Sequence, residues 1–436
     1  MEADTAPSPP PESVESKQNE IVCDTNKNTN PTTISHTTLL QWMDITVLEP
    51  EKRTNTSMKM QDTYIVYLVE TRVTDENMKG YGERTTSLWR RYSEFELLRN
   101  YLDIMYPAIV IPPLPEKKAT YTWLNSPTDK LDPEFVERRR NALEIFLLRI
   151  AAHPVICSDK IFMAFLQQEN SWKEMVYSTD FQSKADSRLK ALNASFRLKK
   201  PDRRFEEIKN YSNELQNNIS NILKIRAKIC DRLYGIHKVH ANYARVFGEW
   251  SSIEKEMAEA LQSTGHYMDV YASSIDGILD ETEQYADQLK EYLAFGESLR
   301  SVCRKYECMQ YDLERAEDGL SSKAAQRDVL SQGKAPGSFS ISGMKSKIFG
   351  NDTPEQRDEK IKQLDEQIQQ AEVELQQTNE ETAKFVEAAL RDTERFKRQK
   401  AKDLQEIFTN FAIMQIKECK KGIAIWTSAK DCMSKI

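Results

Sequence analysis

Long helical stretches dominate the second half of this chain. No proline occurs between Pro201 and Pro336, and apolar residues recur at alternating intervals of three and four, which places them on one face of a helix. In the first stretch these positions are Phe205, Ile208, Leu215, Ile219, Ile222, Ile229, Leu233, Ile236, Tyr243, Phe247 and Trp250. Polar residues at 212, 226 and 240 interrupt the series. The pattern predicts a long helix whose apolar seam faces another helix.

Two more stretches repeat this spacing. The second has apolar residues at Leu289, Tyr292, Leu299, Val302, Tyr306, Met309, Leu313, Ala316 and Leu320, and the third at Ile361, Leu364, Ile368, Ala371 and Leu375. The third opens with Thr353-Pro354-Glu355-Gln356, which combines a capping box with proline at the first helical position. We expect a short break near Gly265 and a loop at about 332–352 between the helices.

Each of these helices should exceed roughly 50 residues, or ~75 Å at 1.5 Å per residue. Three such helices in one chain predict an elongated antiparallel three-helix bundle over residues 201–436. A protomer of this kind exposes a long apolar seam. We therefore expect it to dimerise.

Composition narrows the function classes. The net charge of −7 argues against a surface drawn as a whole to nucleic acid or anionic lipid, so nucleic acid is not an expected partner and any lipid contact must be a local patch. The seven cysteines are scattered, with no CxxC pair, which predicts reduced thiols rather than a disulfide framework or a zinc site. No window approaches 18 uncharged apolar residues, and the acidic, proline-rich start is unlike a signal peptide. We expect a cytoplasmic protein.

Motifs for catalysis are missing from the sequence. It contains no P-loop, GxSxG, GxGxxG or HExxH pattern. His237 and His240 would lie on adjacent helical turns, but no third metal ligand accompanies them. The expectation is a protein that is not an enzyme and has neither a cofactor nor a metal site.

The first 200 residues have a different pattern. Residues 1–35 are rich in Pro, Ser, Thr, Asn and Glu, which predicts a disordered tail. Three β-branched and aromatic stretches follow, at 39–48, 63–73 and 86–95, and predict a three-stranded antiparallel meander. The prolines of VIPPLPEKK then favour an extended segment.

A second helix should begin at Asp132 and Pro133, an N-cap followed by proline at the first helical position. Its apolar stripe is Phe135, Leu143, Phe146 and Ile150. Pro154 should end this helix, and a short helix from Ser158 should complete the domain near Trp172.

Three segments of this region, in this order, resemble the PX domain of sorting nexins: WRRYSEF at 89–95, PPLPEK at 112–117 and FVERRR at 135–140. The resemblance implies a PX domain over 38–172 that binds phosphatidylinositol 3-phosphate. It assigns the 3-phosphate to Arg91, the inositol ring to Tyr92, the 1-phosphate to Lys117 and the ring hydroxyls to Arg139. A guanidinium fork suits phosphate oxygens, in agreement with this assignment.

The helical stretches resemble the BAR domain of the same sorting nexin subclass. The fold class expected from both resemblances is α+β, a PX domain followed by an all-α elongated three-helix BAR bundle. The resemblance further implies a homodimer or a heterodimer with related PX–BAR sorting nexins. It also implies a peripheral location on curved early endosomal membrane, tubulation, and roles in cargo recycling and autophagy.

Other segments carry open interpretations. Arg90, Arg138 and Arg140 are expected to be solvated or membrane-facing charges, because adjacent positions point in different directions. In the loop before the second helix, Tyr121, Trp123 and Leu124 suit a bilayer interface, but could equally pack into the domain core.

Residues 173–200 predict an amphipathic linker helix with apolar residues at Phe181, Ala185, Leu189, Leu192 and Phe196 and with basic neighbours that include Lys199 and Lys200. This helix could insert into lipid or dock on the neighbouring domain. In the bundle, a basic cluster of Arg395, Lys397, Arg398, Lys400 and Lys402 could contact anionic lipid or form a solvated face.

An alternative function uses PPLPEK differently. Pro112 to Lys117 fit a P-x-x-P-x-K ligand of SH3 domains. On this reading the chain is a coiled-coil scaffold that binds proteins and does not distinguish lipids.

Overall fold

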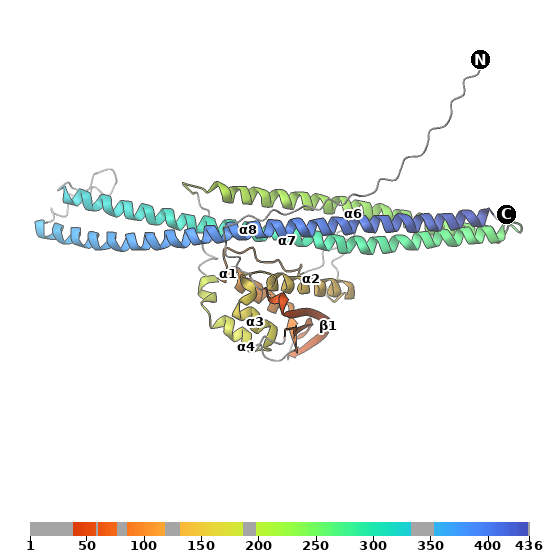
Figure 1. The fold of residues 1–436 in the computed structure, drawn as a ribbon, viewed down its shortest axis with the longest axis horizontal. Helices are drawn as coiled ribbons and strands as arrows, with labels where there is room; N and C mark the ends of the chain where they lie inside the picture. The colour runs from red at the N-terminus through yellow and green to blue at the C-terminus, as the bar shows by residue number, and fades with distance from the viewer. Residues whose placement is uncertain are drawn as a thin grey trace, which may run out of the picture. The chain divides into compact units, whose positions relative to one another are not determined.

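The computed structural model describes residues 38–57, 60–75, 85–117, 131–185, 198–332 and 353–434 (Figure 1). We refer to residues 38–185 as the N-terminal domain and to 198–434 as the helical bundle. The predicted tail at 1–35 lies outside the described residues, and its predicted disorder stays a prediction.

The N-terminal domain contains a three-stranded antiparallel sheet in the order β1-β2-β3, which confirms the predicted meander. The strands are β1 (Met43–Ser57), β2 (Met60–Val73) and β3 (Thr85–Arg91). The third strand is shorter than predicted, since α1 (Tyr92–Met105) begins directly after Arg91. The Glu94 carboxylate accepts the Arg91 backbone N–H (2.7 Å) and so caps this helix. The prediction that YSEF continues the strand was therefore wrong.

A bulge in β1 is held by the second long helix, α2 (Pro133–Ala151). The register shifts between Val47 and Pro50, so the backbone of Val47 needs partners outside the sheet. The Val47 N–H donates to Glu144 (2.8 Å), and the Val47 carbonyl accepts from Arg140. Arg140 thus binds backbone, contrary to its prediction as a solvated or membrane-facing charge.

Helix α2 forms as its sequence predicts. The Asp132 carboxylate accepts the Glu134 backbone N–H (3.0 Å), with proline at the first helical position. The predicted apolar stripe is buried in the core of the domain. In place of one helix from Ser158 to Trp172, the chain forms the 3-10 helix η2 (Ile156–Ser158), α3 (Lys160–Gln167) and α4 (Ser171–Tyr177). A further 3-10 helix, η1 (Leu39–Gln41), precedes β1.

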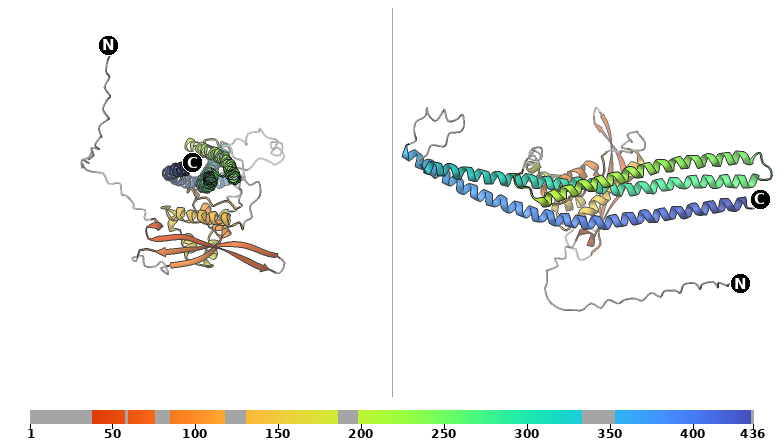
Figure 2. Two further views of the ribbon diagram at one scale, coloured as in Figure 1. Left: turned by 90° about the vertical axis from the view of Figure 1, so that its right-hand side faces the viewer. Right: turned by 90° about the horizontal axis from the view of Figure 1, so that it is seen from above.

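The helical bundle consists of α6 (Arg203–Ser251), α7 (Ala258–Ser331) and α8 (Pro354–Met433) (Figures 1 and 2). Phe205 stacks on Tyr306 (ring centres 3.9 Å apart), whereas His240 meets Tyr271 (4.8 Å). Residue numbers therefore rise along α6 as they fall along α7, and the two helices are antiparallel. Tyr271 contacts Trp426, whereas Tyr292 contacts Phe396, so α7 and α8 are antiparallel as well. The antiparallel arrangement of the three helices is as predicted.

Helix α8 starts at the predicted capping box. The Thr353 hydroxyl accepts the Gln356 backbone N–H, and the Gln356 side chain accepts the Thr353 N–H (3.3 and 3.2 Å). The break between the first two helices is at 252–257 rather than near Gly265. Gly265 lies inside α7, where an added Cβ would be 2.9 Å from the Ala244 carbonyl oxygen. This glycine permits the close approach of α6 and α7.

Each polar interruption of the α6 seam has a specific contact. The Ser212 hydroxyl donates to the Gly296 carbonyl (2.7 Å), and Arg226 pairs with Glu283. His240 packs its ring against Tyr271 and Trp426. The interruptions thus fix the register of α6 against the other helices.

Only the first part of the predicted seam is covered within the protomer. Phe205, Ile208 and Ile219 are buried, whereas Ile229 is 51% exposed and Tyr243 is 51% exposed. Other exposed apolar residues share this half of the bundle: Ile225, Ile236, Val239, Val246 and Trp250 on α6, and Ile413, Ile416, Ile423 and Trp426 on α8. We call these residues, together with Ile229 and Tyr243, the distal apolar face. Within the described part of the chain, each of these residues leaves at least 39% of its surface exposed.

Candidate functional site

Tyr92 lies at the centre of the candidate site because α1 begins at this residue. Its hydroxyl donates to the Pro115 carbonyl (2.6 Å), which ties the start of α1 to the proline-rich segment. Burial raises the pKa of Tyr92 to about 12. The side chain therefore stays neutral at physiological pH and presents a ring to its neighbours.

Arg139 reaches this ring from α2. Its guanidinium lies 4.9 Å from the Tyr92 ring centre and 4.3 Å from that of Phe135, and it is 8% exposed. It also donates to the Lys117 carbonyl (2.8 Å). Contacts on two rings and a carbonyl hold the charged group in one orientation.

Lys117 completes the group from the segment that follows the prolines. Its ammonium is 6.0 Å from the Tyr92 ring centre and pairs with Glu96 of α1 (2.9 Å). The Lys117 side chain is largely exposed, so its ammonium can exchange this carboxylate for another anion. Tyr92, Lys117 and Arg139 are thus brought together as the sequence predicted.

Arg91 precedes Tyr92 in the chain and is the N-cap of α1. Its guanidinium lies 4.3 Å from the ring centre of Tyr64 on β2, and the residue is exposed. The N-terminus of a helix favours anions through its free N–H groups and its dipole. Arg91 therefore adds a positive charge at an end of α1 that already favours negative ligands.

The PPLPEK segment is folded as a wall of this site. Its carbonyls at Pro112, Pro115 and Lys117 accept from Arg99 (3.2 Å), Tyr92 and Arg139, respectively. Pro112 is buried. A free extended ligand of an SH3 domain needs these groups to be accessible, so the fold disfavours the scaffold alternative.

Arg90 is buried, so the prediction that it is a solvated or membrane-facing charge was wrong. It is 1% exposed and donates to the carbonyls of Phe165, Gln168 and Glu169, which lie at the end of α3 and just after it. The Trp172 ring lies 5.6 Å away. Burial lowers the pKa of Arg90 to about 10, and the residue stays charged near neutral pH. Arg90 thus joins β3 to the end of α3 inside the N-terminal domain.

The predicted membrane loop, Tyr121, Trp123 and Leu124, lies outside the described residues, as do Leu189, Leu192 and Phe196 of the predicted linker helix. Phe181 is described and is 7% exposed in the N-terminal core, so that core extends beyond the predicted boundary at 172. For Phe181, the docking interpretation holds rather than the lipid one. Lys199 pairs with Asp318 of α7 (2.6 Å), and Lys200 with Glu317 (3.6 Å).

The predicted basic cluster of α8 contains Arg395, Lys397, Arg398, Lys400 and Lys402. Lys397 and Lys400 each lie 5.5 Å from the Tyr211 ring centre on α6. Arg395 pairs with Asp392 (2.6 Å), and the remaining two residues are exposed. Positions two apart point to opposite sides of a helix, so these charges divide between two sides of α8. Their contact with lipid stays a prediction.

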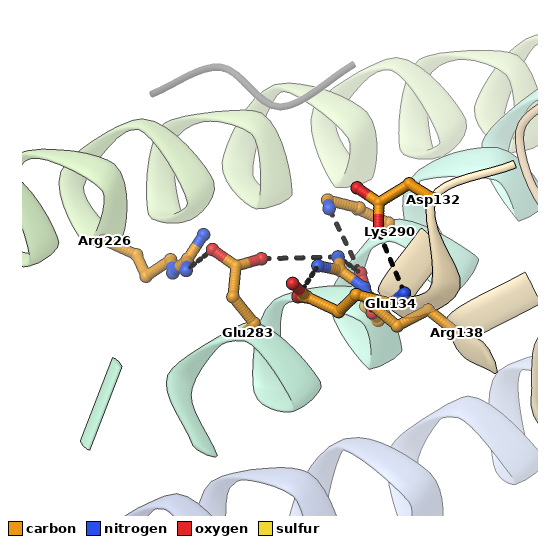
Figure 3. Close-up of polar contacts among 7 residues, drawn as sticks. Asp132, Glu134, Arg138, Arg226, Glu283 and Lys290 are labelled. Carbon is orange, nitrogen blue, oxygen red and sulfur yellow. Dashed lines mark hydrogen bonds and ion pairs between the residues drawn. The ribbon is translucent and has the colours of Figure 1, made fainter. Parts of the chain in front are cut away.

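Arg138 connects the N-terminal domain to the bundle (Figure 3). Its guanidinium donates to both carboxylate oxygens of Asp287 (2.7 and 2.6 Å) and to Glu283 (3.3 Å), both on α7. Glu283 also accepts from Arg226 of α6. One carboxylate therefore joins guanidinium groups of two other elements. Arg138 is an interdomain contact, not the solvated or membrane-facing charge that the sequence suggested.

The other end of α2 is attached as well. Arg149 donates to Glu291 of α7 (2.9 and 2.7 Å) and pairs with Asp403 of α8. Just beyond the helix, His153 lies 2.9 Å from Asp392 of α8. The Asp392 carboxylate also accepts the Val110 backbone N–H (2.8 Å). Two ends of one helix are thus bound to the bundle.

The proton of His153 is located by its surroundings. Nδ1 accepts the backbone N–H groups of Val155 (3.1 Å) and Ile156 (3.4 Å), so Nε2 carries the proton and donates to Asp392. Burial lowers the pKa of His153. Burial alone would raise the pKa of Asp392, but the bonds and charges of His153 and Arg395 lower it to about 2.

This interface was missed by the sequence analysis, although two signals pointed to it. Glu283, Asp287 and Glu291 recur every four residues, which gives α7 an acidic stripe on one side. The run Arg138-Arg139-Arg140 cannot serve one surface, because consecutive helical residues point about 100° apart. In the fold, these three arginines contact the bundle, the candidate site and the β1 bulge, respectively.

Neither a metal site nor a membrane-spanning helix is present in the ranges that the structure describes. No group of three or more His, Cys, Asp or Glu side chains in these ranges is arranged to hold a metal ion. Within the same ranges, no helix has both the length and the apolar character needed to cross a membrane.

Known proteins resemble this chain in sequence and in fold. Residues 78–169 match the model of the PX domain family. Sorting nexin-4 of Homo sapiens is 57% identical over 398 residues, which cover 91% of this chain and 88% of the human protein. Sorting nexin-4 of Neurospora crassa is 26% identical over 419 residues, covering 88% and 83% of the two chains. The cryo-EM structure of the SNX-BAR Mvp1 tetramer matches with a TM-score of 0.53 and 17% identity, covering 88% of this chain and 99% of that chain.

Proposed function

This chain belongs to the sorting nexin-4 group of the sorting nexin family, with a PX domain and a BAR-like helical bundle, and from that premise we propose that it binds phosphatidylinositol 3-phosphate on endosomal membrane as a dimer. The protein acts without catalysis. Its cellular role in this proposal is the recycling of cargo and support of autophagy at early endosomes.

The observation that carries the proposal is the convergence on Tyr92. A lipid headgroup of this kind combines a ring of hydroxyls with phosphates, and it needs cationic donors around a flat surface. Arg139 lies above the Tyr92 ring and Lys117 lies beside it. Arg91 precedes Tyr92 in the chain, and its guanidinium lies over the ring of Tyr64 on β2. Donors of this type, held by α1, α2 and the proline segment, support a phosphoinositide pocket.

Each residue has a distinct role in the proposed complex. Arg91 provides a bidentate guanidinium for the 3-phosphate at the N-terminus of α1. Tyr92 packs against the inositol ring, and Arg139 donates to its hydroxyls. Lys117 exchanges Glu96 for the 1-phosphate, which is possible because this ion pair is exposed.

The distal apolar face supports the dimer. A row of exposed Ile, Val, Tyr and Trp side chains along α6 and α8 is unusual for a monomer and is typical of a surface that another protein covers. In the proposal a second copy, or a related PX–BAR sorting nexin, covers it. Two pockets on one assembly then bind the same membrane, and linkage raises avidity by ~100-fold when both engage.

Additional lipid contacts belong to the same proposal. The exposed Arg398 and Lys402 of α8 would each contribute ~1 kcal/mol near an anionic leaflet. The loop with Tyr121, Trp123 and Leu124 and the remainder of the linker helix would add apolar contacts at headgroup depth. Together these contacts favour a curved surface that the helices can follow.

The test is flotation of the full-length protein with phosphatidylcholine vesicles that do or do not contain phosphatidylinositol 3-phosphate. The wild type should float only with the phosphoinositide, and Arg91→Ala should reduce binding by about 100-fold, since a charge-assisted bidentate contact and the avidity of two pockets are lost together. Arg53→Ala is the matched control, because Arg53 also lies over an aromatic ring, that of Trp89 (4.8 Å), but on β1.

The Arg53 variant should bind as the wild type does. Equal flotation with both kinds of vesicle, or full binding by Arg91→Ala, would contradict the proposal and favour a protein scaffold.

A further inference from the structure

We propose that Glu283 is a positioning residue for membrane binding: by bridging Arg138 and Arg226, it holds α2 and the phosphoinositide pocket in one orientation on the helical bundle. The inference rests on the proposed function. It concerns the presentation of the pocket to a membrane rather than the affinity of the pocket for its headgroup.

Helix α2 contributes to both the candidate pocket and the contact with the bundle. Arg139 of this helix contributes to the candidate pocket, and the adjacent Arg138 binds the bundle (Figure 3). Neighbouring residues on a helix are fixed to each other by the backbone, with a rise of about 1.5 Å. Any movement of Arg138 relative to α7 therefore moves Arg139, and the pocket with it.

Helix α2 is attached to the bundle at two points. Arg138 pairs with Asp287 and Glu283, and eleven residues later Arg149 pairs with Glu291 and Asp403. The two attachments are about 16 Å apart along the helix. These attachments hold α2 against α7 and α8, and Glu283 is the member of the first attachment that also reaches α6.

Glu283 connects three elements, because it lies on α7 and pairs with arginines of α2 and α6. Its carboxylate accepts from Arg138 of α2 and from Arg226 of α6, and the three side chains are 14%, 20% and 10% exposed. At this depth an ion pair is screened much less than on the surface. If Glu283 were removed, the largely buried Arg226 would lose its carboxylate partner. Arg138 would lose its link to α6.

The arginine partner of Glu283 on α6 lies next to the proposed dimer surface. Arg226 lies on α6 beside Ile225 and three residues before Ile229, two members of the distal apolar face. A second chain that covers this face fixes α6, and Glu283 passes that constraint to α2. The two pockets of a dimer would then face one membrane in a defined relation, which avidity requires.

The test uses the full-length protein with Glu283→Gln, which keeps the size of the side chain and removes its charge. Three quantities are measured: affinity for soluble inositol 1,3-bisphosphate by calorimetry, affinity for phosphatidylcholine vesicles containing phosphatidylinositol 3-phosphate, and mass by sedimentation. We expect unchanged headgroup affinity and mass, and vesicle affinity reduced by about ten-fold or more. Glu281→Gln, an exposed position on the same helix, should match the wild type in all three.

Unchanged vesicle affinity for Glu283→Gln would overturn the inference, as would an equal loss of headgroup and vesicle affinity, because the latter would show damage to the pocket itself. A rescue gives a second criterion. Arg138→Glu alone should weaken vesicle binding, and Arg138→Glu combined with Asp287→Arg should restore it by re-forming the pair with reversed charges. If the double variant binds vesicles no better than the single one, the inference is also overturned.

The result also separates this inference from the proposed function. If the wild type does not select the phosphoinositide and Arg91→Ala has no effect, the proposed function fails. If Arg91→Ala abolishes vesicle binding while Glu283→Gln has no effect, only the positioning role of Glu283 fails.

Discussion

In the N-terminal domain, apolar side chains such as Leu143, Leu147 and Phe162 are completely buried, whereas in the distal half of the bundle Ile229, Tyr243 and Ile423 leave half or more of their surface exposed. The first region is a compact α+β core that one chain completes. The second consists of long helices that can cover one another only on one side. The difference shows that the N-terminal domain buries its apolar side chains within one chain, whereas the distal bundle leaves apolar side chains exposed where we propose a dimer contact.

The largest expected effect is on the core of the N-terminal domain. Leu147→Ala, at a fully buried position of α2, should lower the free energy of opening of the domain by about 3 kcal/mol through lost burial and the cavity that remains. Hydrogen exchange of the α3 amides measures this opening. Ile145→Ala, on the same helix but 39% exposed, should cost less than about 1 kcal/mol. Similar losses for both variants would contradict the assignment of one inner face to α2.

The second prediction concerns the distal half of the bundle. Ile229→Glu places a charge on the distal apolar face, which should weaken dimerisation by about 2 kcal/mol, or roughly thirty-fold in Kd. Sedimentation equilibrium measures the Kd. Val373→Glu is the control, since Val373 is also exposed but lies on α8 outside this face, and its dimer should be unchanged. A dimer equally tight in both variants would mean that another surface joins the two chains.

The smallest expected effect concerns the junction between the regions and is a dependence on pH. In the folded state Nδ1 of His153 accepts two backbone N–H groups, and burial lowers its pKa below 6.5. The unfolded imidazole takes up a proton near pH 6.5, so below that pH the unfolded state binds more protons and stability falls as pH falls. The slope should reach at most about 1.4 kcal/mol per pH unit, and stability should be fully present above pH ~6.5.

Denaturant unfolding between about pH 7.5 and pH 5.5 measures this dependence, with protection of α2 amides as the local readout. His153→Gln removes the titrating group, so this variant should lose less stability than the wild type over the same interval. The same slope in both proteins would assign the effect to other histidines. Asp392 does not contribute in this range, because its pKa of about 2 leaves it ionised throughout.

Local signals explain what the sequence could predict. The N-cap at Asp132, the capping box at Thr353 and the three-stranded order depend on residues close together in the chain, and all three are confirmed. Tyr92, Lys117 and Arg139 could be assigned to one site only because the motif of a known domain places them together. Spacing alone does not bring α1, α2 and a proline segment to one ring.

Non-local contacts explain the errors. Arg90 is buried because it satisfies carbonyls about 75 residues away, at the end of α3. Arg138 meets Asp287 across 149 residues, and no periodicity of α2 reveals that partner. A glycine within a helical sequence usually suggests a break in the helix, but Gly265 lies inside α7 and allows α6 to approach closely. In each case the decisive neighbour belongs to another element.

The contact between Val110 and Asp392 has a consequence for biosynthesis. These residues are 282 positions apart in the chain. At 5–20 residues per second, a ribosome needs about 15 to 60 s to reach Asp392 after it has added Val110. The N-terminal domain therefore emerges and can fold while Ala108 and Val110, which end up in the core of the bundle, have no surface to cover them. For this interval the side chains of Ala108 and Val110 stay exposed, and transiently exposed apolar surface of this kind favours association with other proteins.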